Sequence, residues 1–365
     1  MGGAVHLRAG GRAEPDGLPC DSLAKLDRVL SQVELAQTPV ALDAGGNVAV
    51  AALFLALAER KDVDPSALRG SLGCDPLGAL ARDGRLPFDL ATAGALLGEL
   101  CRVTAQSYPQ LAAAEVDVEV YQVAGAHAAQ ELGYALATGT EYLRHAMAAG
   151  LSVDQASAQL AFRLGVGSDL FLELAKLRAL RLGWAKLVAA FGGGAAAQNT
   201  RIHAISSLRT KTRRDPWVNM LRTTTEAFAA MVGGADALTT RGFDAALGRS
   251  DEFARRIARN AQVILNEEAH VTHVADAAGG SYYIEALTEQ LARAGWQTFQ
   301  EVERRGGMGT ALSSGAITEA IAQTAKAREQ AIAKRTAPIT GVSEFANLSE
   351  EPVRREAASP RPLSA

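Results

Sequence analysis

The chain has 365 residues, a length that suits a single α/β barrel with extensions. Its 37 basic and 40 acidic residues give a net charge of −3, which argues against a nucleic-acid-binding protein, and its 48% hydrophobic content argues against wholesale disorder. No uncharged apolar run reaches the roughly 20 residues of a membrane span, and residues 1–11 lack a signal-peptide pattern. We therefore expect a cytoplasmic protein with reduced thiols at Cys20, Cys74 and Cys101.

Short apolar or β-branched runs alternate with long amphipathic segments along the chain. The predicted strands are residues 4–8, 39–43, 69–73, 117–123, 159–165, 201–206 and 237–241. The predicted helices are residues 47–60, 168–191, 215–232, 250–268 and 282–305. Ser168 is the expected cap of the second of these helices, and Asp215 followed by Pro216 is typical of the start of the third.

Strands that alternate with helices predict a parallel sheet with right-handed crossovers. We expect a TIM-type (β/α)8 barrel over residues 1–337, and no G-x-G-x-x-G turn follows the early strands to favour a doubly wound fold. Seven strands are predicted, one fewer than a closed barrel has, so either one strand escapes the pattern or the barrel is incomplete. Residues 338–365 are rich in Pro, Ser, Glu and Arg and are predicted to form an extended arm or linker.

Motifs that carry chemistry are scarce in the sequence. There is no H-E-x-x-H, no G-x-S-x-G and no P-loop. His270 and His273 lie near Glu267 and Glu268, which could coordinate an ion, but a solvated helix end is the favoured interpretation. We therefore predict no metal site.

The densest basic cluster is R-T-K-T-R-R at residues 209–214, directly after a predicted strand. Ligands of barrel enzymes bind in loops after the strands, so this run is either a phosphate contact or a solvated loop. Arg201 and His203 share one face of the preceding strand because side chains alternate with period two. An inward-facing Arg201 would need an anionic partner, which makes it a candidate ligand contact.

Several ordered blocks of sequence resemble the barrel domain of the methylmalonyl-CoA mutase family. They include A-Q-E-L-G-Y-A-L-A-T-G (129–139), F-L-E-L-A-K-L-R-A-L-R-L-G-W-A (171–185), D-P-W-V-N-M-L-R-T-T-T-E-A-F-A-A (215–230), F-D-A-A-L-G (243–248), F-A-R-R-I-A-R-N-A-Q-V-I-L-N-E-E (253–268), D-A-A-G-G-S-Y-Y-I-E (276–285), G-G-M (306–308) and I-T-G-V-S-E-F (339–345). The resemblance implies radical rearrangement of an acyl-CoA, with adenosylcobalamin as cofactor. It also implies that CoA threads along the barrel axis and that a separate C-terminal domain holds the cobalamin.

The sequence departs from the family in the parts that carry cobalamin and close the barrel. The cobalt-ligating D-x-H-x-x-G motif is absent, because no histidine has Asp two residues before it. We therefore expect no cobalamin-binding domain and no cobalamin bound to this chain alone. The first barrel strand of relatives lies upstream of Met1, so residues 4–8 and 237–241 are expected to flank a gap.

The family's catalytic positions also differ. By alignment on A-G-A, the Y-H pair of catalytic members becomes Glu119 and Val120. The glutamine of I-Q-N-D becomes Gly73 while Asp75 is kept, and the arginine that grips the substrate carboxylate falls at Ala95. Loss of these groups together resembles the small, non-catalytic subunit of the heterodimeric enzyme.

We accordingly expect a small-subunit-like isomerase component, with no catalytic residue of its own, that stabilises a catalytic large subunit. Gln122, Arg201 and His203 match substrate-side positions of the family and are the predicted contacts to an acyl-CoA. Two alternatives remain open. One is a self-sufficient barrel that works with a separate cobalamin-binding protein, and the other is a truncated fragment of marginal stability.

Overall fold

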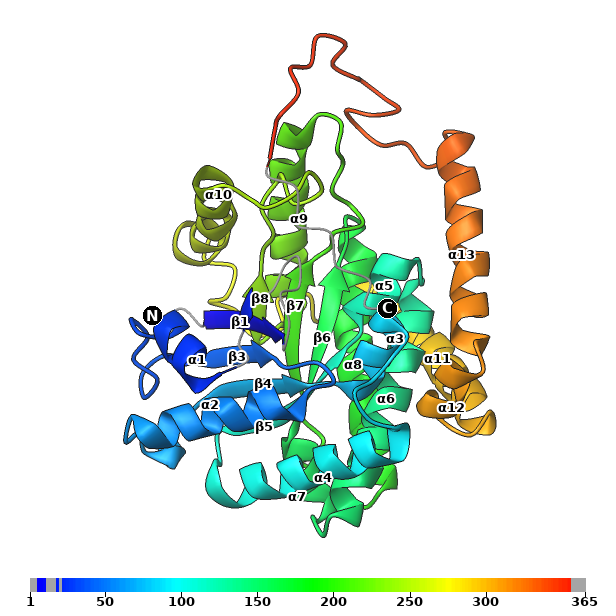
Figure 1. Ribbon diagram of the computed structural model, residues 1–365. Helices are drawn as coiled ribbons and strands as arrows, with labels where there is room; N and C mark the ends of the chain where they lie inside the picture. The colour runs from blue at the N-terminus through cyan, green and yellow to red at the C-terminus, as the bar shows by residue number, and fades with distance from the viewer. Residues whose placement is uncertain (1–4, 11–17, 20–21, 356–365) are drawn as a thin grey trace.

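The protein is described by a computed structural model that covers residues 5–10, 18–19 and 22–355 (Figure 1). One parallel sheet runs through it in the order β2-β1-β3-β4-β5-β6-β7-β8. The strands are β1 (Val5–Gly10), β2 (Leu18–Pro19), β3 (Val40–Asp43), β4 (Gly70–Cys74), β5 (Leu111–Asp117), β6 (Leu160–Val166), β7 (Arg201–Ser206) and β8 (Ala237–Thr239). Within the described ranges, no backbone pairing joins β8 to β1 or β2. The prediction of an incomplete TIM-type barrel is confirmed, with the two-residue β2 as an unpredicted addition.

The predicted strand at residues 117–123 is wrong. The strand is β5 (Leu111–Asp117), and the chain then turns into helix α5 (Glu119–Ala124). The backbone amide of Glu119 donates to the Asp117 carboxylate at 3.1 Å, which helps to start this turn. The error arose because the alternating V-D-V-E-V-Y-Q-V resembles a strand, whereas the Ala-rich run before it has low β-propensity although it is fully buried.

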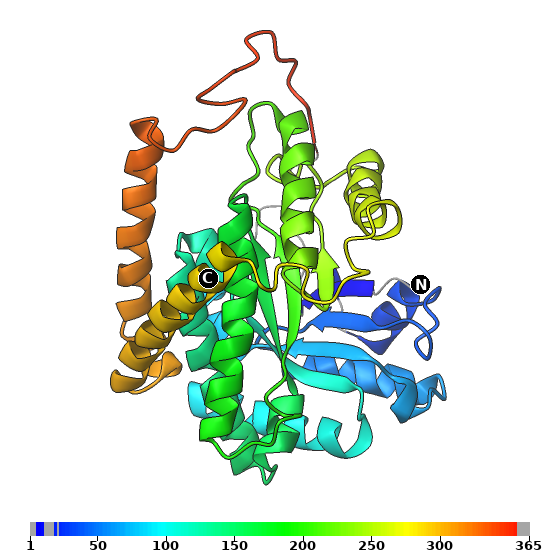
Figure 2. The ribbon, with the colours of Figure 1, turned by 180° about the vertical axis from the view of Figure 1, so that it is seen from behind.

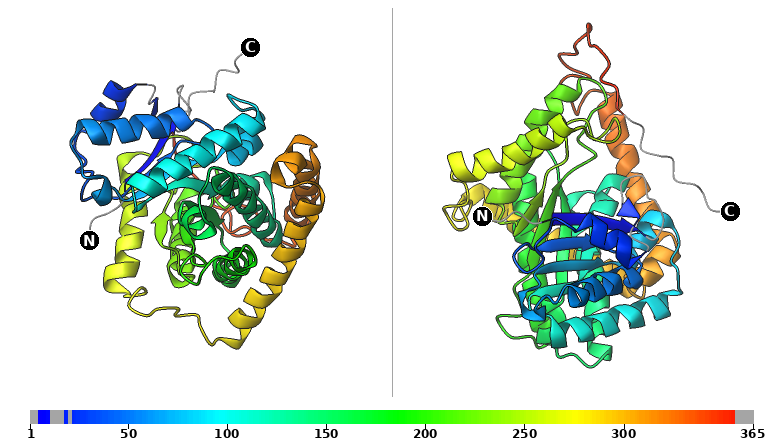
Figure 3. Two further views of the ribbon diagram at one scale, coloured as in Figure 1. Left: turned by 90° about the horizontal axis from the view of Figure 1, so that it is seen from below. Right: turned by 60° about the vertical axis from the view of Figure 1, so that its left-hand side comes forward.

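Helices cover the outer face of the sheet, and a second helical layer lies beyond them (Figures 2 and 3). α11 packs across α6 and α8, far from the strands. The helices are α1 (Leu23–Val29), α2 (Val48–Arg60), α3 (Pro76–Asp83), α4 (Leu90–Ser107), α5, α6 (Ala128–Ala148), α7 (Val153–Ala158), α8 (Leu170–Ala190), α9 (Asn219–Val232), α10 (Glu252–Val263), α11 (Tyr282–Arg304), α12 (Met308–Ser313) and α13 (Ala316–Ala333). Short turns are η1 (Pro65–Ala67), η2 (Pro216–Val218) and the π-helical η3 (Ile264–Glu268).

All five predicted helices are present, with corrections at their starts. Asp169 rather than Ser168 caps α8, since its carboxylate accepts the amide of Leu172. The chain after Asp215 begins as the short turn η2 before α9, and Asp215 makes no side-chain capping bond because its backbone is left-handed, with φ of 43°. Between sheet and helices the core is apolar: Phe162 and Trp184 are fully buried and meet edge to face at 4.9 Å.

After α13, residues 338–355 run across the molecule to α9 (Figure 1). Arg222 donates to the carbonyl of Thr340 at 2.5 Å, and the Glu350 carboxylate accepts the amide of Asp215 at 2.8 Å. Arg355 ends the described segment in an ion pair with Asp244. This part of the predicted arm is therefore anchored at several points along α9 and the residues after β8.

Two glycines with left-handed backbones differ in the space available for a side chain. Gly73 and Gly84 have φ of 61° and 67°, but a Cβ on Gly73 would lie 1.8 Å from the Leu42 carbonyl oxygen, whereas nothing lies within 4 Å at Gly84. We expect Gly84→Ala to lower the free energy of unfolding by about 1–2 kcal/mol, the cost of left-handed strain. Gly73→Ala should cost roughly 1–3 kcal/mol more because of the clash. Urea denaturation measures both, and equal losses would contradict this geometry.

Candidate functional site

The inner face of the sheet, which would line a barrel lumen, is charged rather than apolar. Arg163 of β6 lies between Asp43 of β3, at 3.0 Å, and Asp117 of β5, at 2.6 Å, with Glu115 of β5 at 3.8 Å. All four side chains are at most 6% exposed. Burial opposes the charge of Arg163, but the three carboxylates outweigh it and raise the pKa of its guanidinium above the usual value. The group is therefore a permanent cation at the centre of the lumen.

His203 of β7 joins the same network from the other side. Its Nδ1 lies 3.0 Å from Glu115 Oε1, and its Nε2 lies 2.8 Å from Thr239 Oγ1 of β8. The imidazole therefore connects β5 to β8 across the inner face and has both ring nitrogens engaged.

Asp75 lies at the carboxyl end of β4, where it caps α3. Its carboxylate accepts the amides of Gly78, at 3.0 Å, and of Asp117, at 2.8 Å, as well as the hydroxyl of Tyr142. Burial and the neighbouring Asp117 carboxylate nevertheless raise the pKa of Asp75 to about 6.

An ion pair spans the carboxyl end of the strands. Arg241, just after β8, holds both carboxylate oxygens of Glu119 on α5, at 2.5 and 3.1 Å. It also donates to the carbonyl of Ser206 at 2.6 Å, while the Ser206 hydroxyl accepts its backbone amide at 2.7 Å. The mouth of the lumen is thus occupied by the chain's own side chains.

The three predicted substrate contacts lie in different environments. His203 is in the lumen, as described above, and Gln122 lies on α5 rather than on a strand. The Gln122 amide donates to the carbonyl of Gly165 at 2.8 Å, and its Oε1 is buried with no partner among the described residues. Arg201 is exposed at the amino end of β7 and donates to the carbonyl of Ala158 at 2.8 Å. It therefore lies at the end of the sheet opposite to the mouth, and the substrate role of all three residues stays a prediction.

The basic run at residues 209–214 is partly engaged within the chain. Arg209 donates to the carbonyls of Gln122 and Ala126, at 2.8 and 3.0 Å. Lys211 is buried in an ion pair with Glu226 at 2.5 Å. Arg213 and Arg214 are exposed. Half of the basic groups that could contact a phosphate are thus bound by the protein itself.

The three residues that align with the family's catalytic groups lie in different surroundings. Val120 is half-buried on α5, beside Glu119, and Gly73 has no room for any side chain, as its close approach to β3 shows. Ala95, where the alignment places the family's carboxylate-binding arginine, lies exposed on the outer helix α4. Besides Arg241, a guanidinium near the mouth belongs to Arg82 of α3, whose Nη1 lies 3.9 Å from Asp117. Sequence reasoning missed Arg82, although it follows the retained aspartate, Asp75, by two helical turns.

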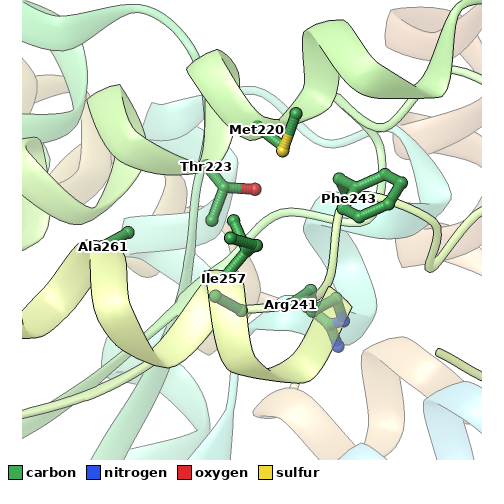
Figure 4. Close-up of a pocket in the computed structure, with 7 residues that line it drawn as sticks. Met220, Thr223, Arg241, Phe243, Ile257 and Ala261 are labelled. Carbon is green, nitrogen blue, oxygen red and sulfur yellow. The ribbon is translucent and has the colours of Figure 1, made fainter. Parts of the chain in front are cut away.

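No metal centre forms within the described ranges, because the structure brings no three His, Cys, Asp or Glu side chains into a metal-binding arrangement there. His270 and His273 stack on each other at 4.5 Å, and both are exposed. One hollow lies between α9 and α10, with Met220, Thr223, Arg241, Phe243 and Ile257 among its lining residues (Figure 4). Its cavity volume of about 10 Å³ is far below the roughly 300–1,000 Å³ of small-molecule sites.

Comparison with known proteins identifies the family. The family model for methylmalonyl-CoA mutase matches residues 4–362, nearly the whole chain. The chain belongs to the methylmalonyl-CoA mutase family. The expectation drawn from the ordered sequence blocks is therefore confirmed.

Relatives within the mutase family include both kinds of subunit. The chain is 51% identical to the methylmalonyl-CoA mutase small subunit of Streptomyces virginiae over 347 residues, which cover 95% of this chain and 55% of the relative. It is 40% identical to the small subunit of Propionibacterium freudenreichii subsp. shermanii, over 92% of this chain and 51% of the relative. The large subunit of S. virginiae is 35% identical over 95% of this chain and 48% of the relative.

The chain spans about half the length of the curated relatives it matches. None of the helices in the described ranges combines the length and apolar character that a bilayer span requires.

The raised pKa of Asp75 predicts a pH-dependent stability. Because the folded-state pKa of about 6 exceeds the usual 3.8, the contribution of Asp75 is full below pH 4 and is lost as the pH rises through 6. Asparagine does not titrate, so the cost of Asp75→Asn to the free energy of unfolding should shrink between pH 4 and pH 7, by up to roughly 3 kcal/mol.

Asp89 provides a control of opposite sign. It caps α4 by accepting the Thr92 amide, which lowers its pKa, so its stabilisation is lost as the pH falls. The cost of Asp89→Asn should therefore grow with pH. Urea denaturation at several pH values measures both variants, and a cost of Asp75→Asn that is constant or rising with pH would contradict the prediction.

Proposed function

We propose that the chain is a small-subunit component of a methylmalonyl-CoA mutase, without an active site of its own, that stabilises a catalytic large subunit. The enzyme would interconvert methylmalonyl-CoA and succinyl-CoA. The observation that carries the proposal is the self-occupied lumen, in which Arg163 and Arg241 are bound by the chain's own carboxylates. Similarity to proteins named small subunit supports it.

Electrostatics argue against acyl-CoA binding in this lumen. Five carboxyl groups and three guanidinium groups gather at its inner face and mouth, among the described residues. They are Asp43, Asp75, Glu115, Asp117 and Glu119, with Arg82, Arg163 and Arg241. An acyl-CoA is a polyanion through its phosphates, so it would meet an excess of like charge and no uncommitted guanidinium.

The catalytic positions add a second, independent reason. A positioned proton donor contributes about 10²–10⁴ to a rate, and Val120 has no group that could donate a hydrogen bond. At Gly73, a glutamine would collide with the backbone of β3. Restoring the family's groups would thus require a rearranged strand as well as new side chains.

Family resemblance implies adenosylcobalamin in the working complex, where it would supply the radical. The residues of this chain do not fit a role in holding the cobalt, because no histidine has the preceding aspartate of the family motif. His203 has both nitrogens engaged by Glu115 and Thr239, and His127 caps α6 by accepting the Gln130 amide at 3.2 Å. In this proposal, cobalamin binds to another polypeptide or domain of the complex.

The remaining expectations are part of the same proposal. Residues 1–337 would form the barrel unit, with 338–365 as an arm that leaves it, and the chain would act in the cytoplasm. Cys74 and Cys101 are buried free thiols, which suits a reducing compartment.

A self-sufficient barrel that uses a separate cobalamin protein is the competing function. The specific observation in its favour is Gln122, whose buried Oε1 has no partner among the described residues and lies beside Gly165 on the inner face. Such a barrel would turn over substrate without a large subunit, which separates the two functions.

The test measures succinyl-CoA formation from methylmalonyl-CoA with adenosylcobalamin and a cobalamin-binding protein present. We expect no turnover by the purified chain, and turnover with a stable complex on gel filtration when the catalytic large subunit is added. Equilibrium dialysis should show no saturable binding of methylmalonyl-CoA to the chain alone. Turnover without the large subunit would refute the proposal and favour the self-sufficient barrel.

A further inference from the structure

We propose that side-chain braces across the lumen hold this open sheet in its barrel curvature. The braces are three contacts that skip over intervening strands: Asp43–Arg163, Glu115–His203 and Glu119–Arg241. The inference is independent of the proposed function, because it concerns only how the fold keeps its shape.

A closed barrel is held curved by a continuous ring of backbone hydrogen bonds. Here the ring is open in the described ranges, where β8 pairs with β7 and has no recorded pairing with β1 or β2. Backbone pairing between neighbours fixes their spacing but leaves the overall curl of an open sheet free to vary. Intrinsic twist and the helices on the outer face favour a curved sheet, and contacts across the lumen can hold that curvature in addition.

The braces have the reach to do so. Neighbouring strands lie about 4.8 Å apart, so strands three positions apart in a flat sheet are separated by roughly 14 Å. Arg163 of β6 nevertheless contacts Asp43 of β3 at 3.0 Å, past β4 and β5. This contact crosses the concave inner face of the sheet directly from β3 to β6. If the sheet became flat, the two side chains would be too far apart to touch.

The second and third braces extend the same principle to the β8 edge. Glu115 of β5 contacts His203 of β7 across β6, and the other ring nitrogen of His203 contacts Thr239 of β8. Glu119, directly after β5, meets Arg241, directly after β8, past both β6 and β7. Burial of Glu115, Glu119 and His203 limits the weakening of these contacts by solvent, whereas Arg241 is partly exposed.

The β8 edge depends most on its brace. β8 has only three residues, and none of them is buried. α9 packs against β8, and α10 packs against α9. The stem of Arg241 lines the hollow under Met220, Phe243 and Ile257, so the brace also joins the two helices to the mouth (Figure 4). Releasing Arg241 from Glu119 should let β8, α9 and α10 move outward together.

The experiment measures the width of the half-barrel by pulsed electron spin resonance. Spin labels are placed at Ala56→Cys on α2 and Thr224→Cys on α9, both exposed, in a chain with Cys20→Ser; Cys74 and Cys101 are buried. α2 packs on β4, and α9 packs on β6, β7 and β8. In Arg241→Gln and in the milder Glu119→Gln, we expect the distance distribution to broaden and to shift outward by roughly 5 Å, about one strand spacing.

Arg178→Gln is the matched control. Arg178 is 16% exposed in its ion pairs with Asp276 and Glu285, compared with 24% for Arg241. These pairs join α8 to the segment before α11 and to the first turn of α11, outside the lumen. Its distance distribution should match that of the parent. Loss of folding in Arg241→Gln alone would also support the proposal. Unchanged distributions in both brace variants, or an equal shift in Arg178→Gln, would overturn it.

Discussion

The guanidinium of Arg163 determines how the charged residues of the lumen are arranged. A buried ion is costly unless it is paired, and here one cation at 5% exposure lies among three carboxylates that are themselves buried. Asp117, held by Arg163, presents its backbone amide to Asp75, and Glu115 extends the network to His203. Strands β3 to β8 are thereby linked through side chains as well as through the backbone ladder.

The same pairing is the physical basis of the proposal that this chain has the fold of an acyl-CoA mutase but does not bind substrate in its lumen. A ligand with anionic groups needs cations that have no internal partner, and the guanidinium groups of this lumen are committed to the chain's own carboxylates. Glu119 occupies the position at which the family resemblance places a tyrosine, and Arg241 neutralises it at the mouth. In this proposal, contacts that stabilise the fold lie where contacts to a substrate would be made.

Five of the helices and the parallel order of the strands could be predicted from sequence, since apolar periodicity and β-α alternation are local signals. Long helices such as α4 and α6 were not predicted. The end of β5 could not, because an alanine-rich buried strand precedes an alternating segment that forms α5. The approach of Arg82 to Asp117 could not be predicted either, because it joins two separate elements, α3 and β5. Glu119 and Arg241 are 122 residues apart, and no local pattern indicates that they meet.

The stability cost of removing Arg163 tests the central claim most directly. Arg163→Met keeps an apolar chain about as long as the arginine's aliphatic stem but leaves Asp43 and Asp117 buried without the Arg163 charge, so urea denaturation should show a loss of about 3–5 kcal/mol. Arg144→Met removes a 51% exposed ion pair with Glu303 and should cost less than about 1 kcal/mol. Similar small losses in both variants would contradict a lumen organised by Arg163.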